Sequence, residues 1–184
     1  MKLLVLASES KRRVQILSML GFKFLVIPSY VEEKHTGAPV LTARRLAFKK
    51  AFTVWKDYKF ATVLGADTIV VLGNRIMGKP LDRADAKGML ISLSGKWHRV
   101  ITGVCVIHPG GTLSFHDTAW VKFRPIKEEE VEEYVATEEP MDKAGAYAIQ
   151  GMGARFVEKI VGDFYTVMGL PANKTYRVLR RVLD

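Results

Sequence analysis

Cysteine and histidine are scarce in this sequence, and their scarcity excludes several kinds of site. The single cysteine, Cys105, cannot form a disulfide within the chain, and its place in the apolar run 104–107 favours a buried, unreactive thiol. Such cysteine usage suits a reducing compartment. The four histidines show no zinc-type spacing with that cysteine, and His98, beside Trp97, is better explained as a structural residue.

Long apolar runs are missing as well. The amino-terminal run covers only residues 3–7 and is followed by the basic residues 11–13. This run is too short for a signal peptide or a membrane span, and its charge order is the reverse of a signal peptide's. We therefore expect a cytoplasmic protein without a membrane partner, in which this run forms a buried first strand.

Several familiar motifs are absent or incomplete. The chain contains no G-x-S-x-G, no G-x-G-x-x-G and no recognition-helix module for DNA, so we expect no stable nucleic-acid partner. Residues 73–79 match the first seven positions of the phosphate-binding loop, but Pro80 replaces the hydroxyl residue that would bind magnesium. Because residues 75–77 fit better as a strand returning from a turn, we reject that interpretation. Lys79 remains either a functional cation stiffened by Pro80 or an ordinary surface charge.

The composition is that of a globular protein with a basic surplus. The 184 residues suit one domain, residues 1–184, with a core of its own. Hydrophobic residues make up 48% of the chain, which argues against disorder. The 28 Lys and Arg against 19 Asp and Glu give a net charge of +9. This surplus favours polyanionic partners such as nucleotides, but charge spread over the surface for solubility explains it equally well.

Strand and helix patterns are mixed along the chain. Apolar and β-branched residues predict strands at residues 3–7, 22–27, 62–72, 98–108, 112–125 and 156–160. Helical spacing and capping residues predict helices at residues 10–21, 41–58, 82–93 and 127–136, and from 171 onward. Since both crossovers and hairpins occur, we predict an α/β domain on a mixed sheet. Residues 137–153, polar and rich in glycine, form either a functional loop or a long loop with ordinary turns.

Two segments place charge where a purely structural explanation fits poorly. Residues 8–13 join the first strand to the first helix, where free N–H groups, Arg12 and Arg13 could hold a phosphate. The alternative is a capped helix with an unfavourably basic first turn. Residues 65–68 interrupt an apolar strand with Asp67, a costly position unless the carboxylate is paired or binds a metal. Asp67 could hold a divalent metal or act as a general base, while an edge-strand turn with a bulge at Gly65 is the structural alternative.

A series of short segments, taken together, resembles the Maf family of nucleotide pyrophosphatases. The segments lie at residues 6–13, 46–51, 65–68, 78–80, 93–95 with His98, 102–104, 142–147, 150–151 and 169–171. Each segment is a weak signal alone, but the series runs in order along nearly the whole chain.

The resemblance implies a fold and an activity. The fold would be a mixed, elongated β-sheet with flanking helices and two lobes around a nucleotide cleft, similar to the inosine-triphosphate pyrophosphatases. The activity would be hydrolysis of a nucleoside triphosphate to the monophosphate and pyrophosphate with Mg²⁺ or Mn²⁺. Asp67 would be the general base, and Glu33 would lie near the metal or the water. The residues that would bind the phosphates are Ser8, Arg12, Arg13, Lys50 and Lys79.

Specificity follows from the same resemblance. At Arg12, Thr68 and Gln150 the sequence is similar to the branch that acts on dTTP and UTP, and differs from the branch that acts on 7-methyl-GTP. Lys11 stands where the family usually has proline, and Thr166 stands where asparagine is common. These two departures leave the loop geometry and the fine specificity open.

A regulator of cell division that binds nucleotides or nucleic acid without catalysis is the alternative function. It would explain the net charge of +9 equally well. Carboxylates such as Asp67 and Glu33 give a pure anion binder no advantage, which favours the enzyme. The family resemblance also implies a possible homodimer.

Overall fold

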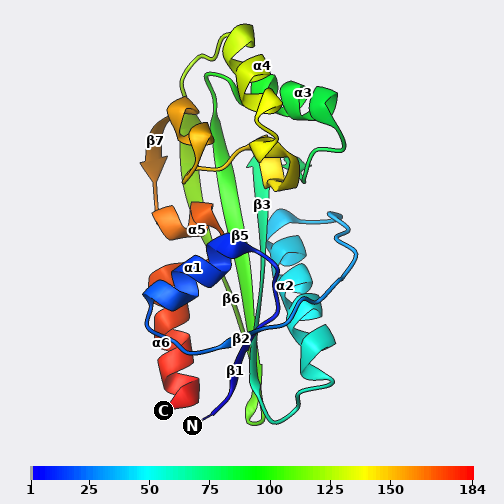
Figure 1. The fold of residues 1–184 in the computed structure, drawn as a ribbon, viewed down its shortest axis with the longest axis vertical. Helices are drawn as coiled ribbons and strands as arrows, with labels where there is room; N and C mark the ends of the chain where they lie inside the picture. The colour runs from blue at the N-terminus through cyan, green and yellow to red at the C-terminus, as the bar shows by residue number, and fades with distance from the viewer. Residues whose placement is uncertain (1) are drawn as a thin grey trace. The chain divides into compact units, whose positions relative to one another are not determined.

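The computed structural model describes residues 2–184, and these form a seven-stranded sheet with helices (Figure 1). The strands are β1 (Leu4–Leu6), β2 (Leu25–Val26), β3 (Thr62–Leu72), β4 (Arg75–Met77), β5 (Trp97–His108), β6 (Gly111–Phe123) and β7 (Val157–Val161). The α-helices are α1 (Lys11–Met19), α2 (Pro39–Trp55), α3 (Arg83–Leu93), α4 (Glu128–Ala136), α5 (Phe164–Met168) and α6 (Ala172–Leu183). Three short 3₁₀ helices are η1 (Glu139–Asp142), η2 (Ala144–Ala146) and η3 (Met152–Phe156). None of the helices within residues 2–184 has the length and apolar character that crossing a bilayer requires.

The sheet is mixed, as the sequence predicts. Its strand order is β2-β1-β3-β5-β6-β7, with β4 paired to β3 outside this path. Strand β1 pairs in parallel with both β2 and β3, so that Val5 lies between Leu25 and Val63. Strands β3 and β4, and strands β6 and β7, pair antiparallel. Crossovers and antiparallel pairs therefore occur in one sheet.

Three local predictions differ from the structure. The strand predicted at residues 22–27 is reduced to β2, whose two residues are exposed at the edge of the sheet. The interruption predicted at residues 65–68 does not occur, because β3 continues through it. Helix α2 starts earlier than predicted, at Pro39, since proline suits the first turn of a helix.

The chain forms two compact units, each assembled from separate segments. Unit 1 comprises Met1–Thr68, Thr102–Asp117 and Gly169–Asp184. Unit 2 comprises Ile69–Ile101 and Thr118–Met168. Strands β3, β5 and β6 each contribute residues to both units. One domain over residues 1–184 stays a prediction.

The core of unit 1 depends on close packing of α2 against the sheet. Ala43, Ala47 and Ala51, spaced four residues apart on one side of α2, are fully buried. A Cβ atom on Gly65 would lie 2.4 Å from the Ala47 carbonyl oxygen, and one on Gly103 would lie 2.5 Å from that of Ala43. Gly65 therefore allows the backbone of α2 to approach β3 closely. It does not mark the edge-strand turn that was the structural alternative for residues 65–68.

The core of unit 2 contains a buried aromatic cluster around His98. This side chain is fully buried, and its Nε2 lies 2.9 Å from the hydroxyl of Tyr147. The ring of Phe123 packs edge-on against it at 4.9 Å between centroids. Burial lowers the pKa of His98 to about 4, so the imidazole is neutral at physiological pH. The structural role predicted for His98 is confirmed.

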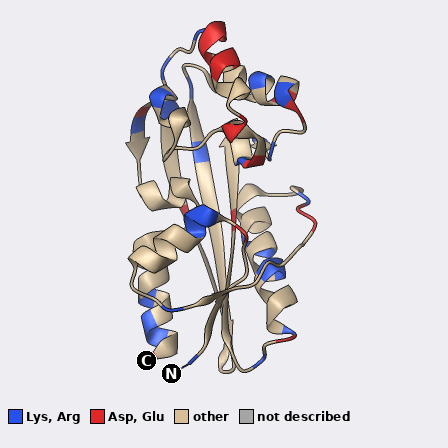
Figure 2. Ribbon diagram, in the orientation of Figure 1, with Lys and Arg blue, Asp and Glu red and all other residues tan. Residues whose placement is uncertain are grey.

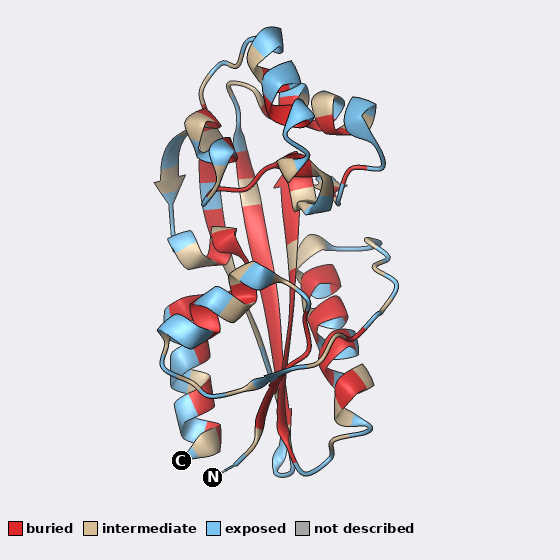
Figure 3. Cartoon of the chain, in the orientation of Figure 1, coloured by how far each residue is buried: buried red, intermediate tan, exposed pale blue. Residues whose placement is uncertain are grey.

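The segment predicted as a polar loop, residues 137–153, is partly core. It contains η1, η2 and the start of η3, and residues 145–149 are buried (Figure 3). The acidic run that follows Lys127 lies on α4 (Figure 2). There Glu128 and Glu132 form ion pairs with Lys87 of α3, which fits the interpretation of that run as a solvated face.

Candidate active site

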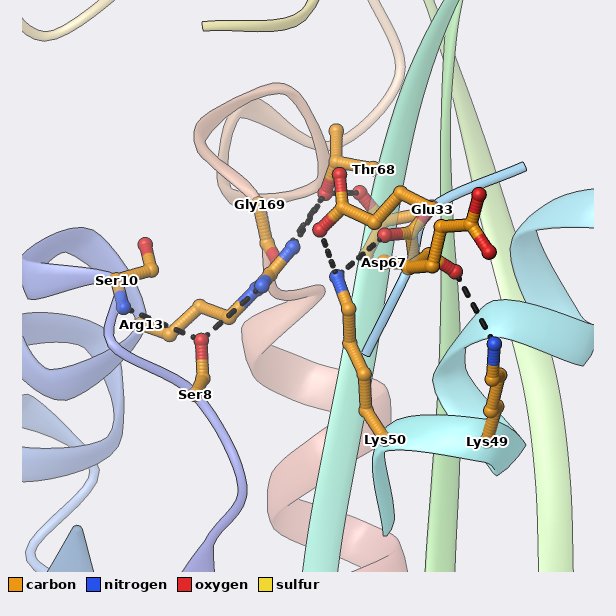
Figure 4. A network of polar contacts seen from close by, with 11 residues as sticks. Ser8, Ser10, Arg13, Glu33, Lys49, Lys50, Asp67, Thr68 and Gly169 are labelled. Atoms are coloured by element: carbon orange, nitrogen blue, oxygen red, sulfur yellow. Dashed lines mark hydrogen bonds and ion pairs between the residues drawn. The ribbon is translucent and has the colours of Figure 1, made fainter. Parts of the chain in front are cut away.

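Asp67 is the centre of a buried charge cluster in unit 1 (Figure 4). Its side chain lies in the middle of β3, and the residue is only 2% exposed. The ammonium group of Lys50 donates to Asp67 Oδ1 at 2.6 Å and to Glu33 Oε1 at 2.7 Å. Lys50 thus joins two carboxylates that are distant in sequence and offsets the cost of burying Asp67.

The second carboxylate oxygen of Asp67 is available for chemistry. Asp67 Oδ2 is buried and has no hydrogen-bond partner among the described residues. A buried oxygen of this kind is costly unless a water molecule, a cation or a substrate group occupies the space beside it. Lys50 therefore orients the carboxylate through Oδ1, while Oδ2 can accept a proton or bind a cation.

The position of Lys50 follows from the packing of α2. Lys50 lies on this helix immediately before Ala51, whose backbone nitrogen would be 2.6 Å from a Cβ atom on Gly65. Gly65 precedes Asp67 by two residues in β3. The close approach of helix and strand thus brings the lysine ammonium to the aspartate.

A second group of contacts lies around Arg13, in the first turn of α1. Its guanidinium donates from Nε to the Gly169 carbonyl at 2.9 Å, from Nη1 to Ser8 Oγ at 3.2 Å, and from Nη2 to Thr68 Oγ1 at 3.1 Å. Burial lowers the pKa of Arg13 from its usual value, and the negative charge of Asp67 opposes that shift. Arg13 therefore connects α1, β3 and the segment before α6. The sequence predicts only that Arg13 binds phosphate, and it does not predict this structural role.

Ser8 and Ser10 lie at the start of α1, where the sequence allows a capped helix. Ser10 is the N-cap residue of α1, but its side chain forms no capping hydrogen bond. Ser8 Oγ instead accepts a hydrogen bond from the Ser10 backbone nitrogen at 3.2 Å. Ser8 is thereby fixed between the start of α1 and Arg13 (Figure 4).

Thr68 is bound to other protein groups through its hydroxyl. Besides accepting from Arg13, Thr68 Oγ1 lies 2.9 Å from Thr102 Oγ1. Thr102 is fully buried in β5. Thr102 and Gly169 belong to the segments that resemble the Maf family. The sequence gives no signal, however, that Thr102 contacts Thr68 or that Gly169 accepts a hydrogen bond from Arg13.

The structure brings most of the predicted site residues together, but not all of them. Unit 1 contains Ser8, Arg12, Arg13, Glu33, Lys50, Asp67 and Thr68. Arg12 is half-buried in the first turn of α1. Lys79 and Gln150 belong to unit 2, where both are exposed.

Gln150 lies beside a carboxylate that sequence reasoning missed. Glu139 accepts hydrogen bonds from the Tyr134 hydroxyl at 2.7 Å and from the backbone nitrogens of Met152 and Gly153 at 3.1 and 3.2 Å. Burial by itself raises the pKa of Glu139, but these hydrogen bonds outweigh it and leave the pKa below its usual value. Glu139 thus fixes the backbone that follows Gln150. The only sequence signal for this role is an acid within a glycine-rich segment.

Two carboxylates of the cluster around Asp67 could bind a divalent metal together with a substrate. Within residues 2–184, no group of three or more His, Cys, Asp or Glu side chains could hold a metal ion. Asp67 and Glu33 nevertheless offer the carboxylate oxygens that Mg²⁺ prefers, and Asp67 Oδ2 is buried without a partner. Mg²⁺ is commonly bound by one or two carboxylates together with substrate phosphates, so these residues fit such an ion.

Comparisons with known proteins show the family and the fold. The family described as Maf-like protein matches residues 3–182. A dTTP/UTP pyrophosphatase from Aquifex aeolicus is 56% identical, over 97% of this chain and 94% of the relative. A dTTP/UTP pyrophosphatase from Geobacillus sp. (strain WCH70) is 44% identical, over 99% of both chains. Among solved structures, a HAM1 protein from Coxiella burnetii shares the fold, with a TM-score of 0.53 and 14% identity over 98% of this chain and 100% of that one.

Proposed function

Because this chain belongs to the Maf-like protein family, we propose that it hydrolyses dTTP and UTP to the monophosphate and pyrophosphate. The names and the high identity of its relatives support the substrates. The observation that carries the chemistry is the buried Asp67 carboxylate, held by Lys50 through Oδ1 and open at Oδ2.

The proposed reaction is attack of water in line on the α-phosphorus. Asp67 Oδ2 accepts a proton as the water oxygen forms its bond to phosphorus. The bond between the α-phosphorus and the oxygen that bridges to the β-phosphorus breaks, and pyrophosphate leaves with that electron pair. Asp67 then returns its proton to solvent. Lys50 keeps the carboxylate oriented, and Glu33 accepts the other hydrogen bond of the ammonium group.

We propose that a divalent cation, Mg²⁺ or Mn²⁺, is held by Asp67 and Glu33. Both side chains supply carboxylate oxygens, which Mg²⁺ prefers, and Asp67 Oδ2 is buried without a hydrogen-bond partner among the described residues. When bound, the cation neutralises phosphate charge that develops during cleavage.

The other predicted site residues bind phosphate, contribute to the base preference, or do both in this proposal. Arg12, Arg13 and Lys79 bind phosphate oxygens, and Ser8 and Lys50 complete that set. Thr68, Arg12 and Gln150 contribute to the preference for a pyrimidine base. What supports the role of Gln150 is its exposure beside a backbone fixed by Glu139.

The sharpest test of the mechanism is Asp67→Asn, which keeps the size of the side chain and removes its basicity. Hydrolysis of dTTP, measured as pyrophosphate release with Mg²⁺, should fall by about 10²–10⁴-fold. The matched control is Asp57→Asn, which changes an exposed aspartate in the same unit and should leave the rate unchanged. Near-normal activity of folded Asp67→Asn would refute the assigned base.

A nucleotide panel tests the substrate class and the alternative function together. We expect dTTP and UTP to be cleaved faster than ITP and 7-methyl-GTP under the same conditions. Product analysis should show a monophosphate and pyrophosphate. A regulator that binds nucleotides without catalysis would bind members of the panel but release no pyrophosphate.

We also propose that the protein acts in the cytoplasm as a homodimer, without a membrane partner or a stable nucleic-acid complex. Self-association is supported by two phenylalanines on the outer side of α2, Phe48 and Phe52, which stack at 5.5 Å and are each 42% exposed. Exposed paired aromatics of this kind are typical of protein contacts. Light scattering on the wild type and on Phe52→Ser would test this, since a monomeric wild type excludes the dimer.

A further inference from the structure

One face of the sheet in unit 2 exposes two tryptophans. Strands β5, β6 and β7 lie in this order in the sheet (Figure 1). Successive side chains along a strand point to opposite faces of a sheet. His98 and Val121 point to the core and are fully buried, whereas Trp97 and Trp120 are 40% and 45% exposed. Exposed tryptophan is uncommon unless the ring has a partner.

The same face carries cations from all three strands. The guanidinium carbon of Arg99 lies 5.7 Å from the centre of the Trp120 ring. Strand pairing places Trp120 opposite Val161 and Lys122 opposite Lys159. We call the six residues Trp97, Arg99, Trp120, Lys122, Lys159 and Val161 the open face.

No carboxylate of the described residues forms an ion pair with these cations. Arg99 donates to the Gly73 carbonyl at 3.2 Å and Lys122 to the Gly95 carbonyl at 2.7 Å, contacts that leave their charges unbalanced. Glu158 lies at the irregularity in register next to Lys159 and provides at most one opposing charge.

The direct pairing of Lys122 with Lys159 is unfavourable within the chain. Like charges directly opposite each other on neighbouring strands destabilise a sheet. An anion placed over the two ammonium groups would remove that repulsion. The open face therefore suits a ligand with negative charges and flat groups that stack on indole rings.

We propose that the open face binds single-stranded nucleic acid, weakly and without sequence preference. Unpaired bases stack on exposed aromatic rings, while phosphates contact the nearby cations. A duplex hides its base faces, and an acidic peptide makes no use of two exposed indoles. If the open face of a second copy of this chain docked here, its three cations would face the three cations of the first copy, and the two faces would repel each other. The proposal does not depend on the pyrophosphatase activity, and a weak complex is compatible with the absence of a stable one.

Salt dependence follows from the number of cations. About three phosphate contacts to a single strand give a slope near −2 in a plot of log affinity against log salt. Binding should therefore weaken about 20-fold between roughly 50 and 200 mM salt. Removing one of the three cations should make the slope shallower by about 0.7.

Fluorescence anisotropy of the full chain with a labelled oligodeoxyadenylate of about 12 nucleotides tests the proposal. Trp120→Ala and Trp97→Ala should each weaken binding on the order of tenfold. Lys159→Gln should weaken it and reduce the salt slope. The matched controls, Phe60→Ala and Lys59→Gln, change exposed residues of unit 1 and should leave binding unchanged.

Three results would overturn this inference. The first is the absence of anisotropy change at low salt. The second is displacement of the oligonucleotide by dTTP, which would place it in the nucleotide site. The third is a wild-type dimer that Trp120→Ala converts to a monomer, which would assign the open face to a second copy. Pyrophosphate release by the variants, expected to be unchanged, shows separately whether they are folded and whether the proposed reaction holds.

Discussion

At the residue scale, the proposed function depends on one lysine that contacts two carboxylates. Lys50 is 7% exposed and contacts both Asp67 and Glu33, so neither contact is a weak surface ion pair. The sequence predicts all three residues through the family resemblance, but with Lys50 assigned to the phosphates. Their direct contact could not be predicted from the sequence. Lys50 is 17 positions from Glu33 and 17 positions from Asp67, and only the packing of α2 brings the three side chains together.

Replacement of Lys50 should affect stability as well as activity. In Lys50→Met the buried Asp67 carboxylate loses its counter-charge, and removal of one partner of a buried pair costs about 3–5 kcal/mol. Urea unfolding measures this loss. Lys49→Met changes the exposed neighbour on the same helix and should cost far less. Equal losses in the two variants would show that the Lys50 contacts do not stabilise the fold.

His98 gives the unfolding free energy a predictable pH dependence. Its pKa is lowered by burial to about 4, whereas the unfolded chain has the ordinary value near 6.5. Between these values the unfolded state binds more protons, so stability falls as the pH drops from about 6.5 to about 4. The loss attributable to His98 is about 3 kcal/mol. The unfolding free energy should depend less on pH in His98→Phe than in the wild type across this range. An identical pH dependence in the two proteins would contradict the lowered pKa of His98.

At the element scale, the contact between α2 and the sheet decides the site. Most elements were predicted from apolar periodicity and capping residues, as for α3, where the Asp82 side chain accepts from the Asp85 backbone nitrogen. The short helical elements were not. Helix α5 and the 3₁₀ helices have too few residues for a periodic pattern, and residues 145–149 are buried because tertiary contacts override their loop-like composition.

Gly65→Ala tests the importance of that contact. The added Cβ would lie 2.4 and 2.6 Å from backbone atoms of α2, which cannot rotate away as a side chain would. We expect a loss of about 1–3 kcal/mol in unfolding free energy together with reduced hydrolysis, because Lys50 moves with the helix. Gly88→Ala in α3 is the control, and it should raise the unfolding free energy instead of lowering it. No atom lies within 4 Å of its new Cβ, and alanine favours the helix by about 1 kcal/mol.

At the scale of the whole molecule, the net charge of +9 favours the attraction of nucleotides. The proposed function also uses a divalent cation at Asp67 and Glu33, and what supports it is the buried Asp67 Oδ2, which has no partner among the described residues. Exhaustive chelation should therefore abolish dTTP hydrolysis, and Mg²⁺ or Mn²⁺ should restore it.

Thermal unfolding gives a second measurement of this prediction. A dTTP analogue with a methylene group between the α- and β-phosphates should raise the Tm with Mg²⁺ present and much less after chelation. Chelation without nucleotide is the control for metal effects on the fold itself. Full hydrolysis after chelation would contradict the proposed cation.

The sequence by itself determined most of the elements and the family, because periodicity, caps and short motifs are local properties of the chain. It also identified Asp67 as a carboxylate whose position in an apolar strand is costly unless it is paired or binds a metal. Only the tertiary structure decided which groups touch: Lys50 between Asp67 and Glu33, Arg13 among Ser8, Thr68 and Gly169, and the cations beside the tryptophans of the open face. These contacts depend on strand register and on how closely a helix approaches the sheet, and both are set by packing between segments far apart in sequence.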